Sequence, residues 1–289
     1  FINLLYNIIK LMSIFSKKLY DINMRNHRKD AIILTVKPHG ESNRLVTFLT
    51  ADEGICTSIL YGGPKSKLRA KVSPWNMGTI YLYNDEVKHS SKITDFDVKN
   101  YHLSFRESLF KMWAANLTTE VVIQSKSAGS PKECFYLLNG FFDGLDIIDE
   151  NQGQMGLLRF LWRYLNLLGI LPNDYNCLKC QNSFITRKND ENTIEYKIGG
   201  AIYSQSEYGF ICQNCLKEYS TKFDRQLYHT LSSKSIIYLE QTIYAEPSIT
   251  RNMILSTDEI NNLKRFIFQM IEQALGNKIK TLHTGIGIL

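Results

Sequence analysis

The spacing of hydrophobic residues in this 289-residue chain changes from strand-like to helix-like near Tyr101. Between Ala31 and about Asn100, short apolar runs alternate with turn signals such as "KPHGES", "ADEG" and "YNDE", a pattern typical of β-strands. After Tyr101 the apolar residues recur at helical spacing, as in "RESLFKMWAANLTTEVVIQ". The pattern therefore predicts an α+β protein in which a β domain precedes a helical domain.

Five short strands are expected in the first of these regions, within about 70 residues, and this number fits a small barrel of the oligonucleotide-binding type, the OB fold. A small meander or an SH3-like barrel would give a similar pattern. The predicted strands lie in "AIILTVKP", "RLVTFLTA", "GICTSILYGG", "GTIYLYND" and "KITDFDVKN".

The helical region carries clear start and stop signals. Pro131 follows Ser130 at the start of "SPKECFYLLNGFFDGLDII", and Gly169 ends "GQMGLLRFLWRYLNLLG". Ser256 and Glu259 form a capping box before a helix that Gly276 ends. The segment "DRQLYHTLSSKSIIYLEQ" is also expected to be helical.

The first residues do not fit either domain. The apolar run "FINLLYNIIKLMSIF" is shorter than the roughly 20 residues of a membrane-spanning helix, and Lys10 interrupts it. The chain begins with Phe1, whereas Met24 opens "MRNHRKDAIILTV". We expect residues 1–23 to be an upstream extension outside the native protein, residues 24–100 to form the barrel, and residues 101–289 to form the helical domain with a metal-binding insert at 173–218.

Composition excludes some classes of protein. With 44% hydrophobic and 21% charged residues the chain can bury a core, which excludes general disorder. A net charge of +6 permits an anionic partner. No G-x-x-x-x-G-K-[ST] motif is present, and the six histidines are scattered singly. We therefore expect a binding protein without catalytic residues rather than an enzyme.

Two Cys-x-x-Cys pairs predict a metal site. Cys177 and Cys180 form the first pair, and Cys212 and Cys215 form the second. Each such turn directs two sulfurs at one centre, and two turns together supply the four thiolates of a tetrahedral structural zinc site. The predicted cofactor is one structural Zn²⁺ per chain. A thioredoxin-like thiol oxidoreductase is the alternative, but it requires one reactive pair in a βαβ unit, and the sequence has two pairs and no such pattern.

A second candidate site is the basic segment "YGGPKSKLRAKVSPW", which is expected to form a loop between two strands. It carries Lys65, Lys67, Arg69 and Lys71 without an acidic residue. Cations at alternate positions of a loop can follow a phosphate backbone. The predicted DNA-binding residues comprise these four and further side chains on the barrel, namely Lys37, Arg44, Tyr81 and Tyr83.

The tyrosines are included because they alternate with aliphatic residues. If Ile80 and Leu82 face the core, Tyr81 and Tyr83 face outward, where unpaired bases can stack on them. The alternative interpretation is a solvated charged loop with surface tyrosines, in a zinc-containing OB-fold scaffold that binds proteins and not DNA.

These features, in this order, resemble the RecO family of recombination mediators. The resemblance rests on "MRNHRKDAIILTVKPHGESNRLVTFLTADEG", "GGPKSKLRAKVSPW", "LLRFLWRYLNLLGILPNDYNCLKC" and "IEQALGNKIKTL", and it extends from Met24 to about Leu282. Two departures are visible: Gln181 stands where the family usually has glycine, and the segment between the cysteine pairs is longer than expected.

The resemblance implies a function in recombinational DNA repair. Family members bind single- and double-stranded DNA, anneal complementary strands, and act with RecR to load RecA onto DNA coated with single-stranded-DNA-binding protein. It implies that Arg44, Lys65, Lys67, Arg69 and Lys71 contact DNA and that the barrel meets RecR. It also implies that the helical domain takes the C-terminal tail of the single-stranded-DNA-binding protein. The expected location is the bacterial cytoplasm, in association with the nucleoid and without a membrane partner.

Overall fold

The computed structural model describes residues 26–63, 65–85, 89–172, 175–187, 194–196, 200–219 and 228–285, so the expected extension at residues 1–23 lies outside the described part. The chain divides into two compact units. Unit 1 contains the chain up to Glu107 together with Ser130–Asp146. Unit 2 contains Ser108–Gly129 and the chain from Ile147 onward. The units are therefore interleaved along the sequence.

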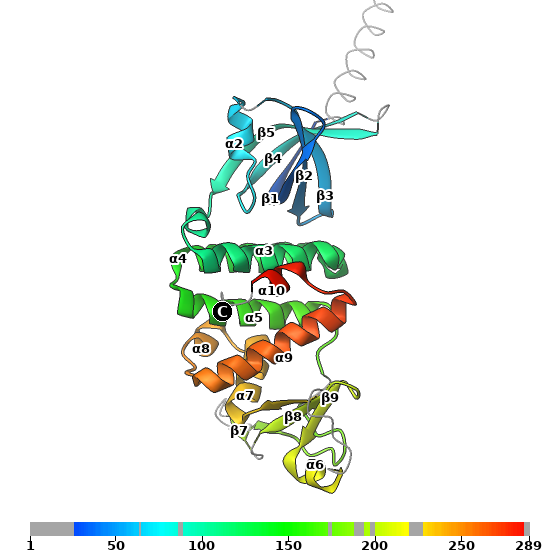
Figure 1. Cartoon of the computed structure of the whole chain (residues 1–289), viewed down its shortest axis with the longest axis vertical. Helices are drawn as coiled ribbons and strands as arrows, with labels where there is room; N and C mark the ends of the chain where they lie inside the picture. Colours follow the sequence, from blue (N-terminus) through cyan, green and yellow to red (C-terminus); the bar gives the residue numbers. More distant parts are fainter. Residues whose placement is uncertain are drawn as a thin grey trace, which may run out of the picture. The chain divides into compact units, whose positions relative to one another are not determined.

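Within the described residues, unit 1 holds a closed barrel of five strands in the order β1-β2-β3-β5-β4 (Figure 1). A closed five-stranded barrel is the architecture of the OB fold, so the predicted fold class is confirmed. Neighbouring strands are antiparallel, except that β3 and β5 pair in parallel. The strands are β1 (Asn26–His39), β2 (Asn43–Thr50), β3 (Gly54–Leu60), β4 (Met77–Asp85) and β5 (Ser90–Asn100).

The length of β1 allows the barrel to close. Residues 26–32 of β1 pair with β4, and residues 31–39 pair with β2, with a bulge between Ile33 and Thr35. Alternation along the strands directs one set of side chains inward. The barrel core consists of Ala31, Ile33, Val46, Phe48, Leu60, Val72, Ile80, Leu82, Ile93 and Phe96.

Two further elements complete unit 1. A 3₁₀ turn, η1 (Leu103–Arg106), follows the barrel, and the helix α4 (Pro131–Ile147) returns to this unit later in the chain. His102 lies between them, fully buried, with Nδ1 2.7 Å from the carbonyl oxygen of Trp75 and Nε2 3.0 Å from Oδ1 of Asp143 on α4. The imidazole ring stacks on Phe105, which also contacts Phe142. This cluster attaches α4 to the chain that leaves the barrel.

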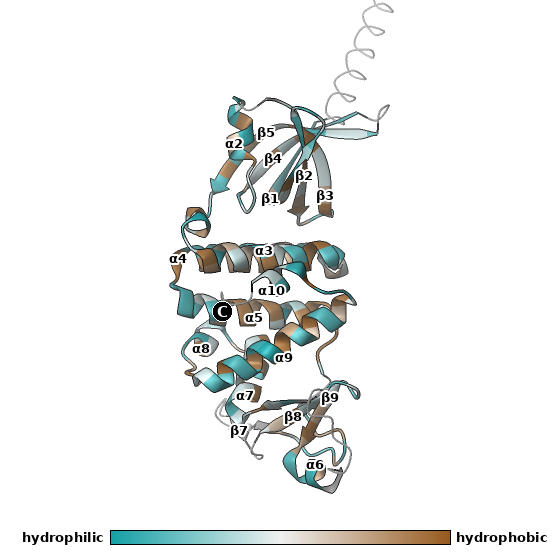
Figure 2. Ribbon diagram, in the orientation of Figure 1, coloured by the Kyte–Doolittle hydropathy of each residue, from teal (hydrophilic) through white to brown (hydrophobic). Residues whose placement is uncertain are grey.

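Unit 2 is built around helix α5, which packs against α3, α7 and α9 (Figure 1). The expected signals delimit these helices: Ser256 and Glu259 form the capping box of α9, and Gly276 ends that helix with φ of 64°. In Figure 2, α9 carries both hydrophilic and hydrophobic stripes, as an amphipathic helix should. The helices are α3 (Leu109–Gln124), α5 (Glu150–Leu167), α6 (Gln213–Tyr219), α7 (Ser233–Tyr244), α8 (Pro247–Arg251), α9 (Thr257–Leu275) and α10 (Lys280–Thr284), with the 3₁₀ turn η2 (Lys126–Gly129) after α3.

The strands of unit 2 correct one prediction. A hairpin of β8 (Ala201–Ser204) and β9 (Gly209–Cys212) is extended by β10 (Tyr228–Leu231), which was expected to be helical. Leu231 is fully buried in β10, and the side chain of Ser232 accepts a hydrogen bond from the amide of Ser235 in the first turn of α7, so the helix begins only after this point. A short separate pair consists of β6 (Ile185–Arg187) and β7 (Ile194–Tyr196).

Among the helices that the structure describes, none combines the length and the apolar character needed to cross a lipid bilayer.

Candidate functional site

The basic segment is not the extended loop that the sequence predicted. Residues 67–71 form a short helix, α2 (Lys67–Lys71), and the turn before it is closed by a hydrogen bond from the Ser66 amide to the Gly63 carbonyl. Leu68 and Val72, four positions apart, both pack on the barrel core, which explains why this segment is helical. The cations at positions 67, 69 and 71 therefore do not share one face, because alternate residues of a helix point in nearly opposite directions.

The helix still presents its charges to solvent. Lys65 and Lys67 are exposed, while Arg69 and Lys71 are partly exposed. Each of the four side chains therefore remains accessible to solvent in the described structure. The segment thus keeps its positive charge at the surface, where it can meet an anionic partner.

Lys37 and Arg44 lie at the β1–β2 hairpin. Arg44 faces Pro38 across this hairpin and Leu60 at the end of β3. Because the basic segment begins directly after Leu60, Arg44 lies beside its first residues. Lys37 is exposed one position before Pro38. The strand pairing therefore places Lys37 and Arg44 at the same end of the barrel as Leu60, where the basic segment begins.

Tyr81 and Tyr83 lie on β4 and alternate with buried aliphatic residues, as expected. Ile80 and Leu82 face the core, whereas both tyrosines are partly exposed. Lys92 on β5 places its ammonium group 4.6 Å from the centre of the Tyr83 ring, which is cation–π geometry. The tyrosines and the basic segment are neighbours, since α2 contacts β5 and β5 pairs with β4 (Figure 1).

Two acidic residues that the sequence analysis missed connect these parts. The ammonium group of Lys71 lies 3.3 Å from Oδ1 of Asp95 and 3.9 Å from Oδ1 of Asp97. The hydroxyl of Tyr81 donates to Oδ2 of Asp97 at 3.0 Å, and this hydrogen bond raises the pKa of Tyr81. The sequence alternation "TDFDV" placed the two aspartates outward, but their neighbours depend on the strand register.

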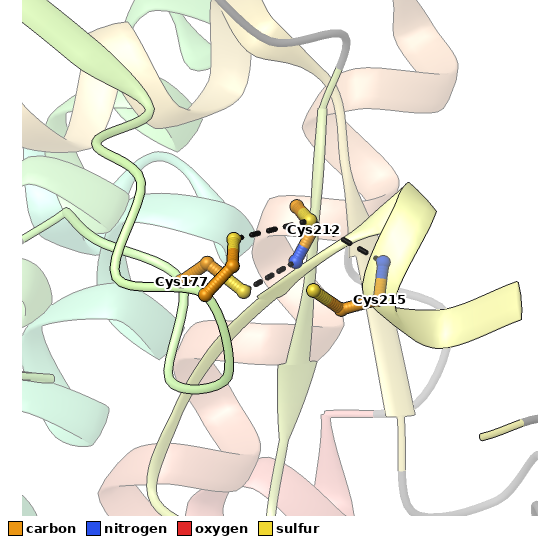
Figure 3. Close-up of side chains that lie close together, drawn as sticks. Cys177, Cys212 and Cys215 are labelled. Carbon is orange, nitrogen blue, oxygen red and sulfur yellow. Dashed lines mark hydrogen bonds between the residues drawn. The ribbon is translucent and has the colours of Figure 1, made fainter. Parts of the chain in front are cut away.

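The four cysteines of the two Cys-x-x-Cys pairs come together in unit 2. Figure 3 shows three of them, Cys177, Cys212 and Cys215, with their side chains close together. Their sulfur atoms all lie within 4.8 Å of one another, and the sulfurs of Cys180 and Cys212 are 3.9 Å apart. Cys177 comes from a tight loop, Cys212 ends β9, and Cys215 lies in α6. Sulfurs bound tetrahedrally to zinc at about 2.3 Å would be separated by about 3.8 Å, so the cluster fits this metal.

Backbone amides already support negative charge on this cluster. The amide of Cys212 donates to the sulfur of Cys177 at 3.3 Å, and the amide of Cys215 donates to the sulfur of Cys212 at 3.5 Å. Burial alone would raise the pKa of Cys177, but amides of Cys180, Cys212 and Lys179 outweigh it and lower this pKa to about 6. Hydrogen bonding to Cys212 raises the pKa of Cys215. Thiolates this close together repel one another, and a divalent cation would relieve the repulsion.

A cluster of three arginines lies elsewhere in unit 2. Arg159 and Arg163 are one turn apart on α5, and Arg251 ends α8. Burial lowers the pKa of Arg163, and the charges of Arg159 and Arg251 lower it further. Within the described residues, none of the three forms an ion pair with a carboxylate. Arg163 donates to the carbonyl of Thr242 at 2.8 Å, near the end of α7.

Exposed apolar side chains also occur on α7, on α8 and in the segment that follows α8. Tyr244 ends α7, Ile249 lies in α8 and Ile254 follows it, and all three are exposed. We call this group the arginine surface: Arg159, Arg163, Arg251, Tyr244, Ile249 and Ile254. Sequence analysis did not find it, because its members come from α5, α7, α8 and the segment after α8, whose packing the sequence does not display.

Residues 24–102 match the family model described as "Recombination protein O N terminal", and residues 106–283 match "Recombination protein O C terminal". The chain is 30% identical over 162 residues to "DNA repair protein RecO" of Syntrophobacter fumaroxidans, covering 55% of this chain and 64% of the relative. It is 28% identical over 159 residues to the protein of the same name from Heliobacterium modesticaldum, covering 54% and 56%.

The match to these two relatives thus spans less than two thirds of their lengths. A longer match, 23% identical over 265 residues, is to "DNA repair protein RecO" of Desulforamulus reducens and covers 89% of this chain and 93% of the relative.

Proposed function

The chain belongs to the RecO family of DNA repair proteins, and we propose on this basis that it binds single- and double-stranded DNA, anneals complementary strands and mediates recombinational repair without catalysing a reaction. The observation that carries the proposal is the acid-free run of Lys65, Lys67 and Arg69, which are exposed or partly exposed and follow directly on the strand end at Leu60 that pairs with Arg44.

The physical basis of annealing is charge neutralisation. Two complementary strands repel each other through their phosphates, so a protein that neutralises part of this charge lowers the barrier to pairing. Contacts to the sugar–phosphate backbone leave the base edges free to find their partners. The cations of α2 and of the hairpin supply these backbone contacts. Tyr81 and Tyr83 stack on bases that are not yet paired.

The test is a salt titration of binding to a labelled single strand. Replacing Lys65, Lys67 and Arg69 together by alanine removes three phosphate contacts. The affinity should fall by about 30-fold at moderate salt, and the log–log salt slope should become shallower by about 2, because each contact contributes roughly 0.7 on single strands. Annealing of two complementary oligonucleotides should slow in parallel.

A matched control has the same change in charge at other exposed lysines. Lys132, Lys234 and Lys278 are all exposed and lie outside the barrel. Their combined replacement by alanine should leave the salt slope nearly unchanged. Equal slopes for the two triple variants would refute the assignment of the DNA-binding residues.

The alternative function is a protein-binding scaffold whose basic segment is only solvated. If the protein is such a scaffold, the wild type should bind DNA only weakly, and the two triple substitutions should change this binding equally. The same titration therefore separates the two functions.

We further propose that the cysteine cluster holds one structural Zn²⁺. The metal would be bound by Cys177, Cys180, Cys212 and Cys215, and it would connect the loop at residue 177 to β9 and α6. Four sulfur ligands leave no open coordination position, so the metal would stabilise the fold without taking part in chemistry. Metal analysis of the purified protein should find one zinc per chain. A protein that is folded and free of metal would exclude the proposal.

Partners follow from the family. We propose that the barrel meets RecR, that RecA is loaded indirectly, and that the C-terminal tail of single-stranded-DNA-binding protein docks on the arginine surface. Positive charge beside exposed apolar side chains suits a peptide that is both acidic and apolar. The proposed location is the bacterial cytoplasm, in association with the nucleoid.

Docking of the tail can be tested with a synthetic acidic peptide that ends in apolar residues. Arg251 is exposed, so Arg251→Glu should leave the fold intact and weaken peptide binding by about tenfold. Lys278→Glu is a control with the same change in charge at an exposed position. Equal binding by the two variants would place the peptide elsewhere.

A further inference from the structure

The outward face of β4 and β5 mixes aromatic residues with acids. We define the tyrosine face as Tyr81 and Tyr83 on β4 with Asp95 and Asp97 on β5. Tyr81 pairs with Asp95 across the two strands, and Tyr83 pairs with Lys92. Both aspartates are more than half exposed. An acidic pair is unexpected on a surface that is proposed to bind a polyanion, and its placement therefore calls for a physical explanation.

A β-bulge produces this placement. The register between β4 and β5 shifts between Tyr81 and Leu82, so that Tyr81 faces Asp95 while Leu82 faces Ile93. Thr94 is the extra residue, and its hydroxyl donates to the Tyr81 carbonyl at 3.1 Å. Ile93 and Phe96 both remain in the core, while Asp95 and Asp97 both point outward. Bulges commonly redirect side chains near functional sites.

The backbone around Asp97 and Val98 also approaches β4 closely at Gly78, which pairs with Val98. A Cβ atom added to Gly78 on β4 would lie 2.2 Å from the carbonyl oxygen of Asp97. Only glycine permits this approach of the two strands. The bulge and the glycine together hold β5 against β4 in the register that brings the aspartates beside Tyr81.

The acids hold their neighbours in place. Asp97 accepts a hydrogen bond from Tyr81, and Asp95 and Asp97 both lie within 4 Å of the Lys71 ammonium group. Asp95 also accepts the amide of Phe96 at 2.8 Å, and this bond, with the contribution of Lys71, lowers the pKa of Asp95. The carboxylate of Asp95 is therefore negatively charged at neutral pH, and Lys71 is already partly neutralised.

The two carboxylates of this face, which stand beside the cations Arg28, Lys71 and Lys92, affect the two forms of DNA differently. A duplex carries one charge per about 1.7 Å of its axis, and its bases are paired inside, so any approach brings phosphates towards the aspartates. A single strand has a lower charge density and can turn unpaired bases to the tyrosine rings while its phosphates point away. Repulsion by the carboxylates therefore weakens the binding of duplex more than the binding of single strands.

We propose that Asp95 and Asp97 determine strand selectivity at the barrel: they exclude the phosphates of duplex DNA from the tyrosine face and reserve Tyr81 for unpaired bases. This inference rests on the proposed DNA-binding function and extends it. Duplex binding is then confined to Lys65, Lys67, Arg69 and the β1–β2 hairpin. A protein with this preference would hold two separate strands and release the duplex that they form.

The test compares the wild-type protein with the double variant Asp95→Asn/Asp97→Asn. Asparagine keeps the size of each side chain and removes the charge. Dissociation constants are measured for a 25-nucleotide single strand and for the matching 25-base-pair duplex at one salt concentration. The duplex should bind about tenfold more tightly to the variant, because each exposed carboxylate near a phosphate accounts for roughly a three- to fivefold change. Single-strand binding should change by less than about threefold.

The barrel contains a matched control. Lys29 interacts with Asp52 and Glu53 at the β2–β3 turn in the same way that Lys71 interacts with Asp95 and Asp97. The variant Asp52→Asn/Glu53→Gln makes the same change in net charge at the β2–β3 turn, which lies at the end of β2 away from the β1–β2 hairpin. It should increase the binding of both forms of DNA only slightly and equally. Circular dichroism checks that both variants are folded, and the single variant Asp97→Asn serves if the double variant is not.

Each result of these binding measurements either supports or refutes the proposed strand selectivity. A fall of about threefold or more in the preference for single strands, seen only with Asp95→Asn/Asp97→Asn, supports the inference. Equal gains for single strand and duplex, or the same result from the control variant, would overturn it. If the wild-type protein bound neither form, the proposed function would fail first, and this inference would fail with it.

Discussion

The barrel surface and the cysteine cluster place their functional groups in opposite environments. On the barrel, Lys65 and Lys67 are exposed, and Lys71 is held only by exposed carboxylates. In the cysteine cluster, three of the four sulfur-bearing residues are buried, and backbone amides hold their positions. Because of this difference, substitutions on the barrel surface should alter DNA binding and leave the fold intact. Substitutions in the cysteine cluster should alter the fold and leave DNA binding by the barrel intact.

The largest effect is expected from Cys177→Ser. Loss of one of four ligands should release zinc, and because binding of a structural metal contributes directly to folding, the unfolding temperature of unit 2 should fall by more than about 10 °C. Metal analysis and calorimetry measure both effects. DNA binding by the variant should stay within about twofold of the wild type. Cys56→Ser, in the barrel, is the control and should retain the metal. A strong loss of DNA affinity in Cys177→Ser would break the contrast between the two regions.

A second prediction tests whether unit 1 has a buried anchor of its own. His102→Ala removes the side chain that connects the Trp75 carbonyl to Asp143 and leaves both groups without this partner. We expect a loss of about 2 kcal/mol in the free energy of unfolding of unit 1, or about 8 °C in its unfolding temperature. His283→Ala removes an exposed pair with Glu272 and should cost less than about 0.5 kcal/mol. Equal costs would show that the buried cluster contributes little.

A third prediction uses pH and concerns the C-terminal helix of unit 2. Glu120 accepts the amides of Lys280 and Thr281 and the hydroxyl of Thr281. Burial alone would raise the pKa of Glu120, but these hydrogen bonds outweigh it and lower the pKa below 4.5. The stabilisation is therefore present above the unfolded-state pKa and is lost as the pH falls through the lower, folded-state pKa.

Glu120→Gln should accordingly destabilise unit 2 by about 1 kcal/mol at pH 7, after allowance for solvent screening. The difference from the wild type should shrink as the pH falls through the lowered pKa of Glu120. Calorimetry of both proteins across this range measures it. A difference that did not depend on pH would indicate that the carboxylate charge is not what holds α10.

The smallest effect is expected from Lys71→Ala. Because Lys71 is already paired with Asp95 and Asp97, its removal should weaken single-strand binding by less than about twofold, whereas Lys67→Ala should weaken it by about threefold. Fluorescence anisotropy at one salt concentration compares them. If Lys71 were the more important of the two, its ion pairs would have to open when DNA binds.

Much of the fold was predictable because its signals are local. Alternation along "RLVTFLTA" and "GTIYLYND" identified barrel strands, and the capping box at Ser256 and Glu259 identified the start of α9. The four cysteines were predictable as one site because each Cys-x-x-Cys spacing already directs two sulfurs at a common centre.

The features that sequence analysis missed depend on long-range packing. The helix α2 has only five residues, and its anchors Leu68 and Val72 are recognisable only once the barrel core exists. The strand β10 acquires its partner from residues about 27 positions earlier, Ala201 facing Leu231 and Ser204 facing Tyr228, so local propensity could not identify it. The contacts of Asp95 and Asp97 with Lys71 depend on a bulge that shifts the register by one residue.

The interleaving of the two units has a consequence for synthesis on the ribosome. The barrel strands end at Asn100, but Asp143, which His102 contacts, emerges only after the whole of α3 has been made. A nascent chain stopped after η1, just beyond the boundary of the N-terminal family match, would leave the His102 and Phe105 rings without Phe142 to cover them. Unit 1 is therefore completed about 40 residues later than its strands, and a truncated protein intended to carry the barrel alone should include Ser130–Asp146 or be expected to aggregate.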